Sequence, residues 1–153
     1  MNSVHPMLTN IRALADPATW QKSIDLADEV LSVWLETPRE FKRIYLVGHG
    51  SSLYNSLAGE YILEHITGIP SKVIPAFAFS AYMEDRLLDL QTLVIGISTT
   101  GGTQSVCDAL ERAHQAGSST LAITAHKDSA ITHHADAVIP TGGEDDQTHR
   151  GGF

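Results

Sequence analysis

The sequence contains a single cysteine, Cys107, in 153 residues. One thiol excludes an internal disulfide framework and is typical of a protein in a reducing compartment. No cationic and then apolar leader opens the chain, and no apolar run approaches the roughly 20 residues that span a bilayer. These absences predict a cytoplasmic protein without a membrane partner.

Positive charge is also scarce, with 10 Lys and Arg against 18 Asp and Glu and a formal net charge of −8. This balance argues against nucleic acid or an anionic membrane as the partner, but not against a small phosphorylated ligand. No Lys or Arg lies between Arg43 and Lys72, or between Arg86 and Arg112. An anion bound by these stretches must therefore be held by backbone dipoles and hydroxyl groups.

Several common site motifs are missing. Residues 48–53 read G-x-G-x-x-L and lack the third glycine of the dinucleotide fingerprint, and no Walker sequence or G-x-S-x-G elbow occurs. His133 and His134 are adjacent and have no third ligand at a metal-ligating interval, while Cys107 lies in a helical pattern that predicts a buried, inert thiol. The sequence therefore predicts neither a metal site nor a cofactor.

Two stretches share one form, an apolar strand that runs into glycines and hydroxyl residues and then into a helix. The first spans residues 44–52 and ends Gly-His-Gly-Ser-Ser, and the second spans residues 93–103 and ends Ser-Thr-Thr-Gly-Gly-Thr. We expect Ser51 and Ser52 to cap the first helix and to offer hydroxyl donors. Two such turns side by side would direct free N–H groups and hydroxyls at one point, which is a phosphate cradle.

Five short apolar runs, rich in β-branched residues, predict strands. They are continuous rather than alternating, which suits strands covered on both faces of a parallel sheet. The runs are Ile44–Val47, Val73–Ala76, Leu93–Ile97, Leu121–Ile123 and Ala137–Ile139. Helical patterns fill the gaps, with Gly68 and Gly117 placed to end two of the helices. The layout is a three-layer, doubly wound α/β fold of five parallel strands, in which ligands bind at the carboxyl ends of the strands.

An N-terminal helical extension over residues 1–40 precedes this domain. Asp16-Pro17 is an N-cap followed by proline at the first helical position, and the residue before Pro38 should end the helix. An apolar stripe at steps of four and three predicts one face in the core or in an interface. Its members are Trp20, Ile24, Ala27, Leu31 and Trp34.

The two turns and the later Gly142-Gly143-Glu144 together resemble the sugar isomerase (SIS) domain. The usual motifs of that domain are G-x-G-T-S, S-x-S-G-x-T and a later G-x-E. The likeness runs from Phe41 to Phe153, and residues 5–17 are similar to the segment that opens the isomerase half of glucosamine-6-phosphate synthase and its stand-alone relatives. The resemblance implies a flavodoxin-like SIS fold and a hexose or amino-hexose 6-phosphate as the ligand. It also implies aldose–ketose isomerisation, deamination or deglycation as the reaction.

The resemblance assigns phosphate binding to glycines and hydroxyl residues of the two turns. These are Gly50, Ser51, Ser52, Ser98, Thr99, Thr100, Gly101 and Thr103. No catalytic residue is assigned. Glu144, His49 and Glu84 are the titratable groups nearest the expected pocket in the sequence; Glu144 and His49 are the candidate acid–base groups, and Glu84 is expected to be a solvated helix residue.

The departures from the family pattern leave alternatives open. No glutaminase domain precedes the isomerase-like part, and Gly102 stands where the family commonly has glutamate. Double-SIS relatives draw their acid–base groups largely from a second domain or a neighbouring subunit. The chain is then either the first half of a longer double-SIS protein or a short form that pairs with another chain, and a homodimer or higher homo-oligomer is expected. The alternative function is a non-catalytic sugar-phosphate sensor, which would act through a protein partner.

Overall fold

The computed structural model describes residues 8, 12, 15–34, 36 and 39–141, and the structural statements below concern these residues. Five parallel strands form one sheet in the order β2-β1-β3-β4-β5. The strands are β1 (Arg43–Gly48), β2 (Ser71–Pro75), β3 (Thr92–Ile97), β4 (Ser119–Thr124) and β5 (Ala137–Pro140). Each overlaps one of the five predicted runs, so the predicted doubly wound parallel α/β fold is confirmed.

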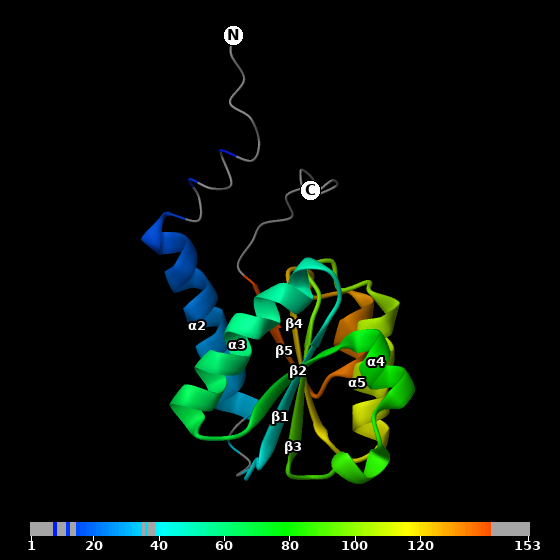
Figure 1. Cartoon of the computed structure of the whole chain (residues 1–153). Helices are drawn as coiled ribbons and strands as arrows, with labels where there is room; N and C mark the ends of the chain where they lie inside the picture. Colours follow the sequence, from blue (N-terminus) through cyan, green and yellow to red (C-terminus); the bar gives the residue numbers. More distant parts are fainter. Residues whose placement is uncertain (1–7, 9–11, 13–14, 35, 37–38, 142–153) are drawn as a thin grey trace.

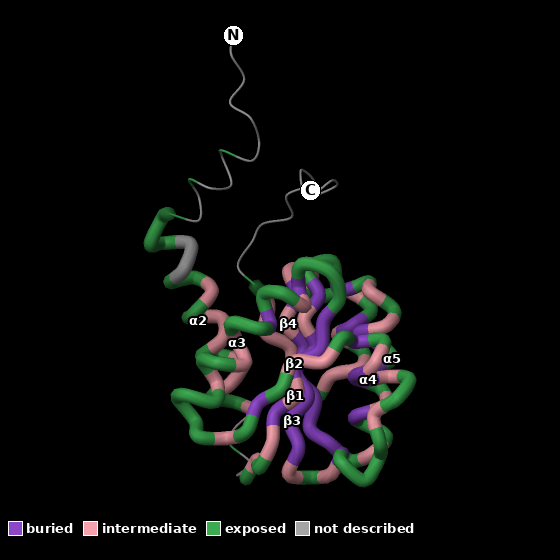
Figure 2. Tube along the Cα trace, viewed as in Figure 1, coloured by how far each residue is buried: buried purple, intermediate pink, exposed green. Residues whose placement is uncertain are grey.

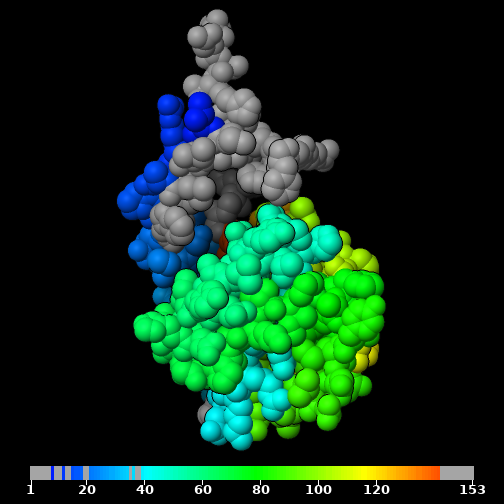
Figure 3. Space-filling model, in the orientation of Figure 1, coloured from blue at the N-terminus to red at the C-terminus, as the bar shows by residue number. Residues whose placement is uncertain are grey.

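Helices cover both faces of the sheet and give three layers (Figure 1). The helices are α2 (Pro17–Trp34), α3 (Ser51–Thr67), α4 (Ala76–Tyr82) and α5 (Gln104–Gln115), with short 3-10 helices η1 (Asp85–Leu87) and η2 (Ala130–His134). α2 and α3 lie on one face and α4 and α5 on the other, and α3 forms part of the molecular surface (Figure 3).

The strands carry apolar side chains on both faces because each face packs against helices. Leu46, Leu93 and Ile95 belong to the core beneath α2 and α3, whereas Val47 and Val94 belong to the core beneath α4 and α5. Burial is therefore concentrated along the central strands (Figure 2). Two separate cores explain why the apolar runs of the sequence are continuous instead of alternating.

The N-terminal helix begins where its capping residue predicts. The Asp16 carboxylate accepts a hydrogen bond from the Ala18 N–H at 2.9 Å, and Pro17 is the first residue of α2. α2 packs against β5 with Ala27, Leu31 and Trp34 partly buried. The sequence predicts Ile24 on the same apolar stripe, but this residue is 51% exposed. The partly buried side of α2 is instead formed by residues 26, 27, 30, 31 and 34. The side chain of Trp20 and the predicted stop at residues 37–38 lie outside the described residues.

The glycines predicted to end α3 and α5 do so. Gly68 follows α3 with φ 69°, and Gly117 follows the C-cap of α5 with φ 88°. In the described part of the chain, no helix combines the length and the hydropathy needed to span a bilayer.

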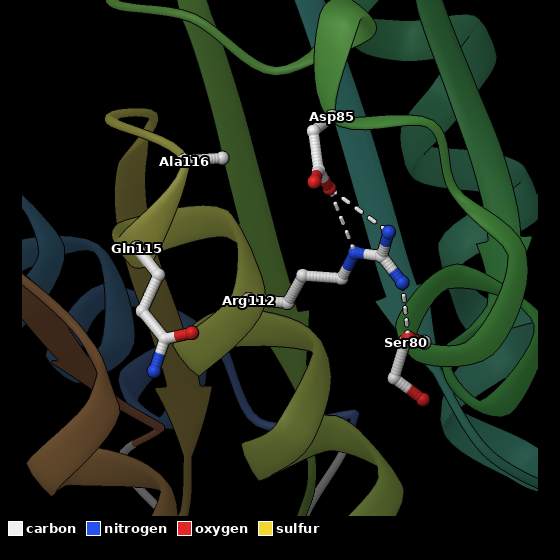
Figure 4. Close-up of a pocket in the computed structure, with 5 residues that line it drawn as sticks. All are labelled: Ser80, Asp85, Arg112, Gln115 and Ala116. Atoms are coloured by element: carbon white, nitrogen blue, oxygen red, sulfur yellow. Dashed lines mark hydrogen bonds and ion pairs between the residues drawn. The ribbon is translucent and has the colours of Figure 1, made fainter.

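Arg112, in the last turn of α5, ties this helix to the segment that follows α4 (Figure 4). Its guanidinium donates to the carbonyl of Ser80 at 2.6 Å, to the carbonyl of Met83, and to the carboxylate of Asp85 at 2.9 Å. The same side chain lines a cavity of about 500 Å³. These oxygens lie at or just beyond the C-terminus of α4. The guanidinium therefore donates to carbonyls that the helix end leaves without a partner in the helix.

Replacing Arg112 with methionine keeps the apolar stem and removes all of these donors. We expect the Arg112→Met variant to lose roughly 1–3 kcal/mol of unfolding free energy, because the half-buried carbonyls lose their partner. Urea denaturation followed by circular dichroism measures the loss. Arg86→Met is the control, since the Arg86 side chain is 78% exposed and pairs with Glu84, which is also exposed. An equal effect in both variants would contradict the role given to Arg112.

Candidate functional site

The two hydroxyl-rich turns leave the sheet next to each other. β1 and β3 are neighbouring parallel strands, and Gly48 at the end of β1 pairs with Ile97 at the end of β3. The chain proceeds from β1 to β2 on one side and reaches β3 on the other, so both turns lie at the topological switch point of the sheet. This is the upper edge of the sheet in Figure 1. The predicted adjacency of the two turns is confirmed.

The first turn presents the beginning of α3 toward this edge. Ser51 is the first residue of the helix and is exposed, whereas Ser52 is 8% exposed. The prediction that Ser51 or Ser52 caps the helix is wrong, because the N-cap is Gly50, with φ 55° and no side-chain capping bond. A helix start that is not capped by a side chain leaves N–H groups for another acceptor.

The hydroxyls of the second turn divide into two sets. Ser98 is 2% exposed, and its Oγ accepts from the Gly101 N–H at 3.1 Å and lies 3.0 Å from Thr103 Oγ1. Thr99 and Thr100 are exposed. Ser98 and Thr103 therefore hold the turn in shape, and Thr99 and Thr100 are the hydroxyl residues of this turn that face solvent.

A third segment, which the sequence reading missed, supports the second turn. Residues 125–131 follow β4, and the Ala125 N–H donates to the Thr99 carbonyl at 3.1 Å while the Ile131 N–H donates to the Gly101 carbonyl at 2.9 Å. Gly101 has φ +65°, and a Cβ on it would lie 1.8 Å from Ser129 Oγ. The sequence contained a signal for this segment. β4 follows β3 in the predicted parallel sheet, so the residues after β4 are expected beside those after β3.

This third segment also carries a positively charged side chain, that of Lys127. Among the described turns that follow the strands, residues 49–50, 98–103, 125–129 and 141, Lys127 is the one lysine or arginine. Asp128 follows it in the chain, so the net charge of this segment stays close to zero. The carboxyl edge of the sheet thus offers mainly uncharged donors.

The candidate acid–base residues fall in different places. His49 lies in the exposed turn between β1 and α3, beside the hydroxyl cluster. Glu84 precedes η1, is exposed and binds Arg86 at 2.5 Å, so it is solvated but does not belong to a helix. It lies near the amino ends of the strands, where Arg43 at the start of β1 contacts the Leu87 carbonyl. Glu144 and the G-x-E segment lie outside the described residues.

Two other groups have shifted pKa values. Burial raises the pKa of the Cys107 thiol, which is 2% exposed inside α5. A hydrogen bond from Thr92 lowers the pKa of Asp89, which precedes β3 at the amino edge. The described residues contain no cluster of three or more His, Cys, Asp or Glu that could hold a metal ion.

Two cavities of the described structure lie away from the hydroxyl-rich turns. The cavity at Arg112 lies at the C-terminal ends of α4 and α5, and a second one of about 270 Å³ lies between Trp34, Arg39 and His114.

The sequence profile of the SIS domain matches residues 39–148, and the chain belongs to the SIS domain family. Among curated relatives, the glutamine–fructose-6-phosphate aminotransferase of Methanothermobacter thermautotrophicus is 38% identical over 137 residues, which are 90% of this chain and 22% of the relative. The aminotransferase of Streptomyces coelicolor is 37% identical over 103 residues, which are 67% of this chain and 16% of the relative. The chain thus spans about a fifth of the length of these relatives.

Solved structures share the fold. The C-terminal domain of glucosamine-fructose-6-phosphate aminotransferase from Francisella tularensis aligns with a TM-score of 0.74 at 20% identity, over 94% of this chain and 41% of that one. Tagatose-6-phosphate ketose/aldose isomerase from Escherichia coli aligns with a TM-score of 0.62 at 23% identity, over 82% of this chain and 37% of that one. Glucosamine-6-phosphate deaminase from Thermotoga maritima aligns with a TM-score of 0.61 at 22% identity, over 84% and 41%. The flavodoxin-like SIS fold expected from the sequence is therefore confirmed.

The contact between Gly101 and Ser129 gives a direct test of how the second turn is held. We expect Gly101→Ala to cost roughly 2–4 kcal/mol of unfolding free energy, because the new Cβ meets Ser129 and the backbone must keep a positive φ. Chemical denaturation of the variant measures the cost. Gly102→Ala is the matched control, since a Cβ there has no atom within 4 Å, and it should change stability by less than about 0.5 kcal/mol. Equal costs at the two glycines would contradict this account of the turn.

Proposed function

We propose that the chain binds the phosphate group of a hexose or amino-hexose 6-phosphate at the two turns after β1 and β3. The observation that carries this proposal is the convergence of both turns at the switch point of the sheet, given by the pairing of Gly48 with Ile97. The proposed donors are the glycines and hydroxyl residues named from the sequence: Gly50, Ser51, Ser52, Ser98, Thr99, Thr100, Gly101 and Thr103. Of these, Ser98 acts mainly by shaping the turn, because its Oγ is already bonded within it.

The related proteins support this choice of ligand by their names. The curated relatives are named for fructose 6-phosphate, and the structural neighbours are named for glucosamine 6-phosphate and tagatose 6-phosphate. A 6-phosphate is the feature that these compounds share. A cradle of neutral donors binds such a group through charge-assisted hydrogen bonds, which are about twice as strong as neutral ones.

We propose that the chain takes part in aldose–ketose isomerisation, deamination or deglycation of this sugar. Fixing the phosphate places the reacting carbons, and an acid–base group then moves a proton between them. His49 is the described candidate for this role, because it lies in the same turn as Ser51. Glu144 remains the second candidate. No metal or other cofactor is part of the proposal.

We further propose that the working form is a cytoplasmic homo-oligomer, in which the SIS domain of residues 41–153 follows the helical segment of residues 1–40. The chain spans about a fifth of the curated relatives. A second copy, or the remainder of a longer double-SIS protein, would supply further acid–base groups.

Phosphate binding is tested with the exposed hydroxyl residues. We expect the Ser51→Ala/Thr100→Ala variant to bind fructose 6-phosphate and glucosamine 6-phosphate more weakly by roughly 2–4 kcal/mol, at about 1–2 kcal/mol for each lost charge-assisted bond. Isothermal titration calorimetry measures this loss. The control variant, Ser32→Ala/Ser80→Ala, removes two hydroxyls that bond only within their own helices and should bind like the wild type. Unchanged affinity in the site variant would refute the assignment.

Proton exchange separates an enzyme from a sensor. We expect the wild-type chain, incubated with fructose 6-phosphate in deuterated water, to incorporate deuterium next to the carbonyl carbon. The His49→Gln variant should slow this exchange about 100-fold, the size typical of general acid–base catalysis. Nuclear magnetic resonance of the sugar follows both reactions. Tight binding without exchange would instead favour the non-catalytic sugar-phosphate sensor.

A further inference from the structure

The cavity of about 270 Å³ lies at the opposite edge of the sheet from the two hydroxyl-rich turns. Trp34 in its wall ends α2, Gly117 and Ser118 connect α5 to β4, and Asp136 directly precedes β5. These strands begin at the lower edge of the sheet in Figure 1, so we call this space the amino-edge cavity. It is separate from the proposed phosphate cradle, and what it binds does not depend on that proposal.

Two polar atoms of residues in this wall are buried without a hydrogen-bond partner among the described residues. They are Nε1 of Trp34 and Oγ of Ser118, a residue that is only 4% exposed. Buried polar groups of folded proteins are nearly always paired, because an unpaired one destabilises the chain. An indole N–H can only donate a hydrogen bond, and a hydroxyl can donate one as well. The group that both atoms lack is therefore an acceptor.

The same wall holds a positive charge that no described carboxylate balances. The Arg39 guanidinium lies 4.9 Å from the centre of the Trp34 ring, and its Nη1 donates to Ser119 Oγ at 2.7 Å. In the described part of the chain, Arg39 forms no ion pair with a carboxylate. The charge is thus held in place by an aromatic ring and a neutral hydroxyl, and it remains available to a ligand.

The carboxylate of Asp136 borders the cavity but is already engaged at both oxygens. One oxygen lies 3.3 Å from Nδ1 of His114, and the other accepts from the Thr120 N–H at 2.8 Å. This carboxylate therefore accounts for neither the unpaired indole nor the guanidinium. What the wall lacks is an acceptor that carries a negative charge.

We propose that the amino-edge cavity binds a small carboxylic acid in its ionised form. Nε and Nη2 of Arg39 have no acceptor among the described residues, and together they form the planar fork that matches the two oxygens of a carboxylate. The Trp34 N–H and the Ser118 hydroxyl are the further donors of the site. The cavity of about 270 Å³ is slightly smaller than the roughly 300–1,000 Å³ of common ligand pockets, so the acid is small. One guanidinium balances the single charge of a carboxylate, whereas a phosphate ester carries up to two.

Such a ligand connects the N-terminal helix to the sheet. Trp34 is the last residue of α2, whereas Ser118 directly precedes β4. A ligand that binds only the folded chain stabilises it by mass action. The acid therefore favours the packing of α2 against β5.

The indole signals of the intact chain test the proposal by nuclear magnetic resonance. The chain has two tryptophans, so its ¹H–¹⁵N spectrum contains two indole signals, and Trp20→Phe identifies that of Trp34. We expect sodium propionate to move the Trp34 signal until the site is saturated. Propionamide, which keeps the carbonyl acceptor but has no charge, should leave the signal in place, as should sodium chloride.

Two arginines near the amino edge give a matched pair of variants for the same titration. Arg39→Gln removes the charge of the site and should weaken propionate binding roughly 10–100-fold, the loss expected for a charge-assisted hydrogen bond. Arg43→Gln is the control and should bind propionate like the wild type, because the Arg43 guanidinium is already paired with Asp89 at 3.2 Å. Circular dichroism checks that both variants are folded.

Ser118→Ala gives a measurement that does not depend on the arginine variants. It removes the buried hydroxyl that has no partner among the described residues. The variant should bind propionate severalfold more weakly, yet its melting temperature without ligand should not fall, because no hydrogen bond within the described protein is lost. A serine with a purely structural role would show the reverse, a lower melting temperature with unchanged binding.

Several results would overturn the carboxylate site. A Trp34 signal that propionate does not move would show that the cavity binds no carboxylate, and an equal response to propionamide would show that charge is not recognised. An equal response to inorganic phosphate would indicate a general anion site. The Ser51→Ala/Thr100→Ala variant changes only the opposite edge and should bind propionate like the wild type, so failure of either proposal is seen independently of the other.

Discussion

The need to cover both faces of a parallel sheet determines where the chemistry of this chain can be. β1 is followed by α3 on one face and β3 by α5 on the other, since helices must cover both sides. The two strands are neighbours, so their turns diverge from one point at the carboxyl edge. Two helix beginnings meet there without a long loop, and the first N–H groups of a helix have no acceptor within that helix.

The second turn is shaped by a hydrogen-bonded frame rather than by the residues that face solvent. The buried Ser98 hydroxyl accepts from the Gly101 N–H, and the segment after β4 donates to the carbonyls of Thr99 and Gly101. The absence of a side chain at Gly101 lets Ser129 approach. Thr99 and Thr100 are then presented on a backbone that β3, β4 and the segment after β4 define, which is the preorganisation that a binding site requires.

The sequence predicted the elements that depend on local pattern. Strands buried on both faces produce continuous apolar runs, Asp16 begins α2, and Gly68 and Gly117 follow two helix ends, because each of these signals is read from neighbouring residues. The adjacency of the two turns was also predictable, since few arrangements connect such strands with right-handed crossovers. The family resemblance rested on the same turns.

Features that depend on partners distant in the sequence were not predicted. Ser98 and Thr100 have similar hydroxyls, and only packing decides that the first is buried and the second exposed. Gly50 replaces a serine cap because its backbone adopts φ 55°. Ile24 is exposed because β5 contacts a face of α2 that is turned slightly from the expected stripe. Periodicity identifies an apolar face but does not say what covers it.

The neutral character of the proposed phosphate cradle separates ligand binding from acid–base chemistry. Hydroxyls and N–H groups hold a phosphate over a wide pH range, because none of them titrates near neutrality. Proton transfer needs an acid–base group, and His49 is the candidate for this role at the described edge. A fold that binds with one set of residues and draws acid–base groups from elsewhere can serve as half of an enzyme or as a sensor, depending on what packs beside it.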